Sequence, residues 1–395
     1  MIEKNYRPTM AACCTGYIVQ AIVCNFAPLL FLTFNSSYGI PLSDIAVLIT
    51  VNFGVQLAVD AASPGFIEKI GMRKAAILGN LFAAAGLAML AFLPDMIGNS
   101  FTGLIISVAV YAVGGGLIEV LLSPIVEAIP CENKEGSMNF LHSFYCWGYV
   151  ITVVLSTVFF KLFGIENWKI LAVIWALVPF ADALAFIKVP LKDEIENNEK
   201  GMTAKELISN KTFWIMALIM VAAGASELAV AQWASALAES GLHVSKTLGD
   251  LLGPTGFAVM MGLARVIYIR INSRISVRYA LVFCSGICIL SYLLIAFSSH
   301  PAIGLAGCGL CGFGVGILWP ATLSFSASMI PRGANRMFAY LALAGDIGCS
   351  VGPTVSGKIA GAFGDDLKIG IFSAIIFPIV LIIAALNVKK EKTQQ

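Results

Sequence analysis

A stripe of polar and small residues runs along one apolar stretch in the first half of the chain. Tyr111, Gly115, Glu119, Ser123 and Glu127 follow one another at every fourth position, which places them on one face of a helix. The other faces are apolar, and the stretch is long enough to cross a bilayer. A carboxylate at membrane depth costs at least a few kcal/mol, so Glu119 is predicted to be a functional residue on a face that meets protein or water.

Glu119 has the chemistry of an ion-coupling residue. Burial in a low dielectric favours the neutral acid, so the side chain could bind a proton from one side of the membrane and release it to the other. When it is ionised, it could also accept a hydrogen bond from a solute hydroxyl. The alternative is a carboxylate that only packs between helices and is hydrogen-bonded by a neighbouring Tyr or Ser.

Further polar and aromatic side chains in the apolar stretches suit a sugar-like solute. Amides and carboxylates bind hydroxyls, and the apolar faces of a pyranose ring stack on indole rings. On these grounds the predicted substrate-binding residues include Glu119, Ser123, His142, Glu227, Gln232, Trp233 and Trp319. His142 titrates near neutrality and could handle protons, or it could be only a hydrogen-bonded polar residue near a helix end. For each Trp the alternative is an interface anchor or a core residue.

The composition excludes a soluble protein. Of the 395 residues, 58% are hydrophobic and 12% are charged, against about 25% charged residues in an average soluble domain. The mean hydropathy is +0.87. The net charge of +2 is too small to indicate a nucleic-acid partner. The first apolar stretch lacks a small-residue cleavage site, so we predict a retained span and not a signal peptide.

The apolar runs predict twelve membrane spans in an all-α protein. Their approximate extents are 10–34, 43–66, 74–93, 100–129, 138–162, 168–189, 211–237, 248–269, 279–298, 301–330, 337–363 and 368–388. The charged, Asn-rich segment 190–210 is predicted to be a cytoplasmic linker between a six-helix bundle at 1–189 and another at 211–395. Within it, TAKELI is predicted to form a short amphipathic helix on the membrane surface.

The basic residues predict the orientation. If the N-terminus is inside, most of the 25 Lys and Arg residues fall on the inner side of the membrane. We therefore expect both termini to be cytoplasmic, in a multi-pass protein of the inner (plasma) membrane.

The two halves of the chain are predicted to be repeats. An offset of 205 residues lays IGMRKA (70–75) over ISVRYA (275–280), and an offset of 201 lays Ile129-Pro130 over Ile330-Pro331. Parallel six-helix repeats of this kind are typical of transporters of the major facilitator type.

No motif in the sequence indicates an enzyme. The chain has no P-loop and no G-x-G-x-x-G after a strand, and we expect no cofactor. Most of the ten cysteines stand where a small apolar residue would pack between helices. Cys308 and Cys311 form a C-x-x-C with no second pair, so packing is favoured over zinc binding, and no metal site is predicted.

The loop after the second span resembles a motif of the major facilitator superfamily. That family usually reads G-x-L-A-D-R-x-G-R-K here, and this chain has PGFIEKIGMRK (64–74), with Pro64 for Gly, Glu68 for Asp and Lys69 for Arg. The resemblance extends along the whole chain. It implies that Glu68 and Arg73 help to hold the cytoplasmic ends of the two halves together in the outward-open state.

The fourth span resembles the fucose:proton symporters and their sodium-glucose-transporter-like relatives. GGGLIEVLLSP (114–124) is similar to their G-x-G-x-x-E-x-x-x-N-P, with Ser123 for Asn, and this implies that Glu119 is the proton-linked, sugar-facing carboxylate. LHSFYCWGY (141–149) and GASELAVAQW (224–233) resemble further motifs of the group. Its acidic residue in the first span is absent here. That span offers Gln20 and Asn25 instead, which we include among the substrate-binding residues.

Three more charged residues lie at membrane depth. They are Asp60, Arg265 and Asp346. We expect Arg265 to neutralise at least one of the two carboxylates, because an unpaired buried charge is far costlier than a paired one. Together with Glu68 and Arg73, these residues form the predicted gating network.

These observations predict a secondary transporter that works by alternating access. The expected activity is uptake of a small neutral sugar or polyol with a proton, by a monomer in the lipid bilayer. Sodium coupling is one alternative, and export of amphipathic drugs or sugars by the same fold is another. A sensor or scaffold that transports nothing is disfavoured, because it needs no coupling carboxylate.

Overall fold

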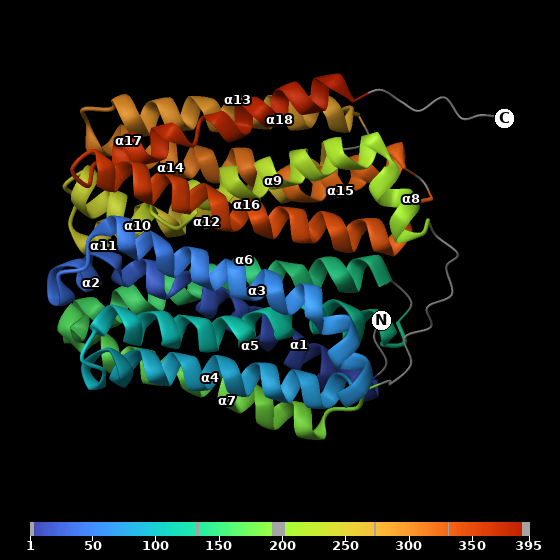
Figure 1. The fold of residues 1–395 in the computed structure, drawn as a ribbon, viewed down its shortest axis with the longest axis horizontal. Helices are drawn as coiled ribbons and strands as arrows, with labels where there is room; N and C mark the ends of the chain where they lie inside the picture. The colour runs from blue at the N-terminus through green and yellow to red at the C-terminus, as the bar shows by residue number, and fades with distance from the viewer. Residues whose placement is uncertain (1–3, 132–133, 192–201, 272–273, 331, 389–395) are drawn as a thin grey trace. The chain divides into compact units, whose positions relative to one another are not determined.

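The computed structural model describes residues 4–131, 134–191, 202–271, 274–330 and 332–388 (Figure 1). They are almost entirely helical and contain 12 segments long and apolar enough to cross a membrane. The prediction of an all-α membrane protein with twelve spans is therefore confirmed. The chain divides into two compact units, Met1–Glu196 and Asn197–Gln395. The repeat relation between the halves and the cytoplasmic position of both termini stay predictions.

The N-terminal unit contains the first six spans. Its described α-helices are α1 (Arg7–Asn25), α2 (Phe31–Tyr38), α3 (Leu42–Ile70), α4 (Met72–Met96), α5 (Ser100–Ala128), α6 (Lys134–Phe163) and α7 (Trp168–Lys188). A 3-10 turn, η2 (Ala27–Leu30), joins α1 to α2 within the first span. Figure 1 shows α4 beside α5 and α7, against both of which it packs.

The C-terminal unit contains the other six spans. Its described α-helices are α8 (Ala204–Ser209), α9 (Lys211–Ala231), α10 (Ala234–Ala236), α11 (Lys246–Leu252), α12 (Pro254–Ile271), α13 (Val277–Phe297), α14 (Pro301–Val315), α15 (Leu318–Met329), α16 (Ala334–Ala362), α17 (Leu367–Ser373) and α18 (Ile376–Asn387). A π-helix, η4 (Leu237–Gly241), follows α10. Several spans are thus interrupted. The break in the seventh span and the break in the eighth lie close together in the sequence.

The predicted TAKELI helix is present as α8. Thr203 forms a capping box with Glu206, in which the Thr203 backbone N–H and hydroxyl bond to the Glu206 carboxylate. These bonds lower the pKa of Glu206, the backbone N–H having the larger effect. Its predicted place on the membrane surface stays a prediction.

Small residues let the helix backbones approach closely. A Cβ added at Gly86 of α4 would lie 2.3 Å from the backbone nitrogen of Tyr111 on α5. In the other unit, a Cβ at Gly348 of α16 would lie 2.0 Å from the Val221 carbonyl oxygen on α9. Neither position can take a side chain without moving a neighbouring helix. Each unit is therefore built around a close pair of helices, as is usual where lipid leaves packing to hold helices together.

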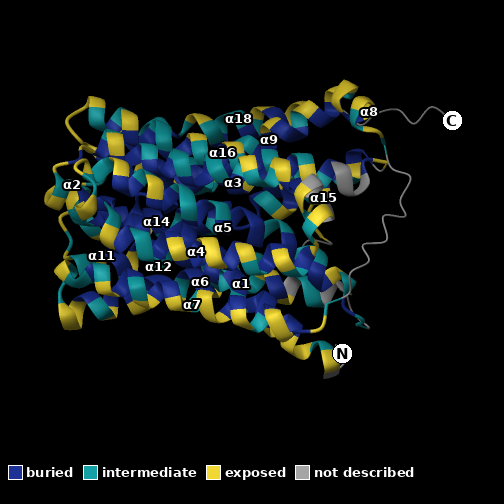
Figure 2. Ribbon diagram, turned by 60° about the horizontal axis from the view of Figure 1, so that its bottom comes forward, coloured by how far each residue is buried: buried dark blue, intermediate teal, exposed yellow. Residues whose placement is uncertain are grey.

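The outer faces are apolar. On α7, six large apolar side chains at helical spacing are exposed, namely Ile170, Ile174, Leu177, Phe180, Leu184 and Ile187 (Figure 2). A contiguous exposed stripe of this kind is unusual on a water-soluble surface and suits contact with acyl chains.

Arg73 and Arg278 make equivalent contacts in the two units. Arg73 donates through Nη1 to the carbonyl oxygens of Phe186 and Ile187, at 2.7 and 3.0 Å, and through Nη2 to that of Val189, at 2.9 Å. Arg278 Nη2 donates to the Val388 carbonyl oxygen at 2.6 Å. Both guanidiniums thus satisfy carbonyls at the C-terminus of the last helix of a unit, where the helix dipole also favours a cation. The offset of 205 residues aligns these two arginines.

We expect Arg73→Ala to destabilise the protein by about 2 kcal/mol, the usual scale for losing a hydrogen bond from a charged donor. Thermal unfolding of the purified protein in detergent measures the effect. Lys74→Ala is the matched control, because Lys74 is the exposed neighbour of Arg73. Equal unfolding temperatures for the two variants would show that the carbonyl contacts of Arg73 do not stabilise α7.

Candidate functional site

A chain of hydrogen bonds joins Glu119 to three buried amides in the N-terminal unit. Gln20 Nε2 of α1 donates to Glu119 Oε2 of α5 at 2.8 Å and to Gln56 Oε1 of α3 at 2.7 Å. Gln56 Nε2 in turn donates to Asn52 Oδ1, one turn earlier on α3, at 3.0 Å. Gln20, Gln56 and Asn52 are each at most 4% exposed. The structure thus brings the predicted Gln20 and Glu119 into direct contact.

Gly115 makes room for this arrangement. It lies one turn before Glu119 on the same face of α5, and a Cβ there would lie 2.9 Å from Gln20 Oε1 and 3.3 Å from Gln56 Cδ. The small residue in the polar stripe therefore admits the two amide side chains against α5.

The oxygen of the Gln20 amide is available as an acceptor. Both bonds of Gln20 Nε2 go to Gln56 and Glu119, whereas Gln20 Oε1 is buried and has no hydrogen-bond partner among the described residues. Buried polar atoms are rarely left without a partner. This oxygen can accept a hydrogen bond from a hydroxyl or a water molecule.

A second polar group lies one helical turn away. Tyr17 OH of α1 lies 3.1 Å from His142 Nδ1 of α6 and 3.3 Å from Ser123 Oγ of α5, and Ser123 Oγ lies 3.4 Å from His142 Nε2. A neutral imidazole donates through one ring nitrogen and accepts through the other, while imidazolium donates through both. Protonation of His142 therefore changes the hydrogen bonds that link these three helices.

Tyr17, Asn52 and Gln56 were not predicted from the sequence. Tyr17 precedes Gln20 by three residues and so shares its face of α1, while Asn52 and Gln56 are two amides four residues apart in an apolar span. Amides at helical spacing in a span are the signal that could have found them. Asn25, which was predicted, donates to the Ala21 carbonyl oxygen of its own helix at 2.9 Å.

The predicted tryptophans are held by contacts within the C-terminal unit. Trp233 is fully buried in the interruption after α9, and its Nε1 donates to the Pro353 carbonyl oxygen of α16 at 2.9 Å. Trp319 of α15 lies against Gly345, where a Cβ would be 2.2 Å from the indole ring. Gln232 is also buried, at the C-cap of α9. Their predicted contact with substrate stays a prediction.

Arg265 donates to a carbonyl oxygen that a proline leaves without its usual helical hydrogen bond. Pro320 lacks the N–H that would bond to the carbonyl of Gly316, four residues earlier. Arg265 Nε of α12 donates to this Gly316 oxygen at 3.0 Å. The charge of Arg265 also acts on Glu227 of α9, a carboxylate that the sequence analysis had not paired with it.

The rest of the predicted gating network stays a prediction. Asp60 lies on α3, and Asp346 lies on α16. Both are partly exposed, and their pairing with Arg265 stays a prediction. The side chain of Glu68 lies outside the described residues.

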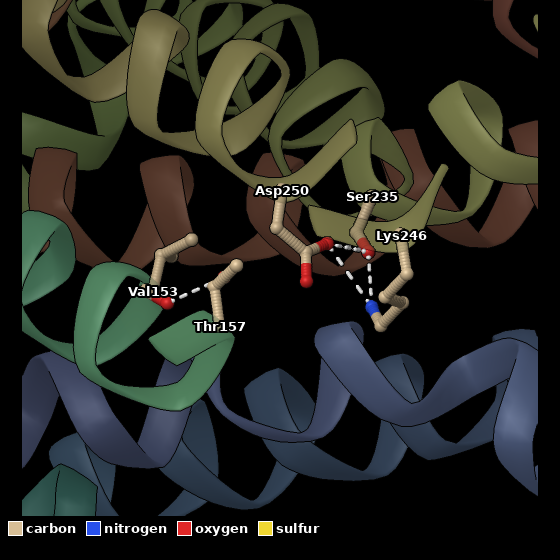
Figure 3. Close-up of polar contacts among 5 residues, drawn as sticks. All are labelled: Val153, Thr157, Ser235, Lys246 and Asp250. Atoms are coloured by element: carbon tan, nitrogen blue, oxygen red, sulfur yellow. Dashed lines mark hydrogen bonds and ion pairs between the residues drawn. The ribbon is translucent and has the colours of Figure 1, made fainter. Parts of the chain in front are cut away.

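An ion pair with a buried carboxylate, which was not predicted, lies in the C-terminal unit (Figure 3). Lys246 Nζ lies 3.0 Å from Asp250 Oδ1, and the Asp250 side chain is 1% exposed. Ser235 Oγ of α10 donates to the same Asp250 oxygen and accepts from Lys246 Nζ at 2.9 Å. Its signal in the sequence is the K-x-x-x-D spacing at the start of the eighth span.

A cavity of about 540 Å³ opens between α1 and α6. Its lining includes Arg7, Met10 and Cys14 of α1 and Phe140 and Phe144 of α6. None of the predicted substrate-binding residues lines it, so it is separate from the group around Glu119.

One protein family and two known proteins match most of the chain. The family model of the Major Facilitator Superfamily matches residues 10–353 and 235–394. The chain is 23% identical to the membrane protein MosC of Rhizobium meliloti over 333 residues, which cover 84% of the chain and 78% of MosC. It is 24% identical to the multi-drug resistance efflux pump PmrA of Streptococcus pneumoniae over 309 residues, covering 75% of the chain and 74% of PmrA.

Solved structures have the same fold. A point mutant of the nucleoside transporter NupG matches with a TM-score of 0.79 at 12% identity, covering 96% of this chain and 98% of NupG. A point mutant of the E. coli fucose:proton symporter FucP matches with a TM-score of 0.64 at 17% identity, covering 98% and 100%. With the twelve membrane-length helices and the family-model match along most of the chain, these findings confirm the resemblance seen in the loop and span motifs: the chain belongs to the major facilitator superfamily.

Proposed function

We propose that the protein imports a small neutral solute rich in hydroxyl groups, most simply a sugar, together with a proton that binds to Glu119. The bond from Gln20 Nε2 to Glu119 Oε2 is the observation that carries this proposal, because it joins the titratable group to a residue that can bind solute. The structures of NupG and FucP, whose names give a nucleoside and fucose as cargo, are consistent with a hydroxylated solute. We also place both termini in the cytoplasm and the protein in the inner membrane, as a monomer.

The hydrogen-bond chain explains how proton and solute could be linked. Ionised Glu119 accepts a charge-assisted bond from Gln20, which holds the amide in one orientation. Protonation removes the charge and weakens that bond, so the Gln20 amide becomes free to turn. Since Gln20 Oε1 is the acceptor offered to a solute hydroxyl, the solute and the proton act on the same side chain. Gln56 and Asn52 carry the change to α3.

Proton movement tests the role of Glu119. In liposomes containing the wild type, we expect a sugar or nucleoside from a panel of hexoses, deoxyhexoses, polyols and nucleosides to evoke proton entry. Glu119→Gln should reduce that entry to the level of protein-free liposomes and retain solute counterflow, because exchange needs no net proton movement. Glu127→Gln is the matched control, since Glu127 lies two turns along the same stripe and is exposed. Unchanged proton entry in Glu119→Gln would remove Glu119 from the coupling step.

A methyl group at Gly115 tests the space beside Gln20. We expect Gly115→Ala to weaken solute binding about tenfold, which corresponds to losing one hydrogen bond of roughly 1.4 kcal/mol. The added Cβ would lie 2.9 Å from Gln20 Oε1 and push the amide away from Glu119. The half-saturating solute concentration for counterflow measures the effect.

The matched control for this variant is Gly54→Ala. Gly54 lies in α3, and nothing lies within 4 Å of a Cβ built there. Ala is favoured over Gly in a helix by about 1 kcal/mol, so neither variant should lose helix stability for intrinsic reasons. Equal solute affinities for the two variants would show that Gln20 does not bind the solute.

Export is the second candidate function, and the match to the efflux pump PmrA favours it. If no solute in the panel evokes proton entry or exchanges in the wild type, dye efflux under a reversed proton gradient becomes the next assay. Replacing the proton gradient by a sodium gradient in the same liposomes separates the remaining alternative of sodium-coupled uptake.

A further inference from the structure

The cavity between α1 and α6 is elongated and lies within one half of the membrane. Its lining residues on α1 share one face of that helix, at the spacing i, i+3, i+4, i+7 and i+8, and they are Arg7, Met10, Ala11, Cys14 and Thr15. The first membrane-length segment begins at Arg7. From there to Thr15 a helix rises about 12 Å, which is less than half of the roughly 30 Å of hydrocarbon in a bilayer.

The cavity opens toward the lipid-facing side of the N-terminal unit. Phe140, which lines it, belongs to a stripe of exposed apolar side chains at helical spacing along α6, namely Phe140, Trp147, Ile151, Leu155, Val158 and Leu162. The face of α1 that meets α5, at Gly16 and Gln20, is the opposite one. A stripe of this kind suits contact with acyl chains, so the cavity is a recess in the surface that lipid covers.

The walls of the cavity are apolar. Met10 and Cys14 are buried at its base, and the rings of Phe140 and Phe144 form its other side with their centroids 5.1 Å apart. The hydroxyl of Thr15 donates to the Ala11 carbonyl oxygen at 3.0 Å, so its proton is already used. The volume of about 540 Å³ lies in the range of pockets that enclose small ligands. A hydrocarbon chain suits such walls.

The mouth of the cavity carries a positive charge. Arg7 is the one charged residue in the lining, its side chain is exposed, and it has no hydrogen bond or ion pair with the residues that the structure describes. A guanidinium binds phosphate oxygens through two parallel hydrogen bonds. The cavity thus offers an apolar slot with a phosphate-binding group at the level where the span begins.

We propose that the cavity between α1 and α6 binds an acyl chain of an anionic phospholipid, whose phosphate is held by Arg7. In the orientation proposed above, Arg7 lies at the cytoplasmic leaflet, where anionic lipids attract basic residues next to a span. A zwitterionic lipid would bring its own cation close to Arg7 and should bind less tightly. This inference goes beyond the proposed transport and does not depend on the solute.

A bound lipid would support the contact between α1 and α6. Tyr17 follows Met10 by seven residues and shares its face of α1. Tyr17 OH lies 3.1 Å from His142 Nδ1 of α6, just beyond the end of the cavity. An acyl chain in the cavity therefore fills the space between the two helices on the membrane-surface side of this hydrogen bond, and it should stabilise their packing.

Native mass spectrometry of the delipidated full-length protein in detergent tests the proposal. The probes are dioleoyl phosphatidylglycerol, dioleoyl phosphatidylcholine, oleate and glycerol 3-phosphate. The first phosphatidylglycerol should bind about tenfold more tightly than the first phosphatidylcholine, the scale of one charge-assisted hydrogen bond. Oleate lacks the phosphate and glycerol 3-phosphate lacks the chains, so both should bind more weakly than phosphatidylglycerol. Detergent micelles have no leaflets, and the result is therefore independent of the orientation.

Arg7→Gln should lower the affinity for phosphatidylglycerol to that for phosphatidylcholine. Lys188→Gln is the matched control and should bind like the wild type. Lys188 is an exposed cation at the same end of the unit, where Thr9 Oγ1 of α1 donates to the Pro190 carbonyl oxygen at 2.6 Å.

Ala11→Phe should fill the cavity and lower the affinity for both phospholipids. Its control is Ala181→Phe, which places the same ring on the exposed face of α7 and should change neither affinity. Thermal unfolding shows that the variants fold. It should also show that phosphatidylglycerol raises the unfolding temperature of the wild type more than that of Arg7→Gln.

Several outcomes would overturn the proposal. Equal affinities for the two phospholipids in the wild type, or unchanged phosphatidylglycerol binding in Arg7→Gln, would remove the phosphate contact. Unchanged binding in Ala11→Phe would place the lipid elsewhere on the protein. Oleate binding as tight as that of phosphatidylglycerol would identify a site for fatty acids, and glycerol 3-phosphate binding as tight would identify a site for free phosphates.

Discussion

A carboxylate inside an apolar helix must be compensated by the protein, because lipid cannot do so. In the N-terminal unit the side chains that meet this constraint come from four helices. Glu119 on α5 requires a donor, and Gln20 on α1 provides it. Gln20 must approach α5 closely, which Gly115 permits. Its second bond holds Gln56 of α3, and Tyr17, one turn away on α1, connects α5 to α6 through Ser123 and His142.

The same constraint applies to backbone carbonyls where helices end or are interrupted. Arg73 and Arg278 cover the last carbonyls of α7 and α18. Arg265 binds the carbonyl that Pro320 leaves without an N–H, and Trp233 binds that of Pro353. These side chains have obvious functional interpretations in a sequence, as gating charges or as a stacking platform. In the structure each one donates to a backbone carbonyl oxygen, and for Arg73, Arg278 and Arg265 that oxygen lies at a helix end or interruption, which is a sufficient physical reason for their presence.

The fold and half of the candidate site follow from the sequence, for different reasons. Length and apolarity alone predict the twelve spans, and the four-residue spacing on α5 predicts the face that carries Glu119 and Ser123. Gln56 and Tyr17 could not be assigned in this way, since their importance depends on which helices meet. The break after α9 and the π-helix η4 were missed as well, because no Gly or Pro between Gly224 and Gly241 marks them in the sequence.

The carboxylates of Glu119 and Asp250 have donors of different kinds, and this difference matters for what a proton can do. The donor to Glu119 is a neutral amide, so a proton on Glu119 removes a charge and leaves none behind. The donor to Asp250 is a cation that also donates to Ser235, so Lys246 joins α11 to α10. On the proposed function, a proton at Glu119 weakens the bond from Gln20 and so acts on solute binding locally, whereas the contacts of Asp250 hold α10 and α11 together.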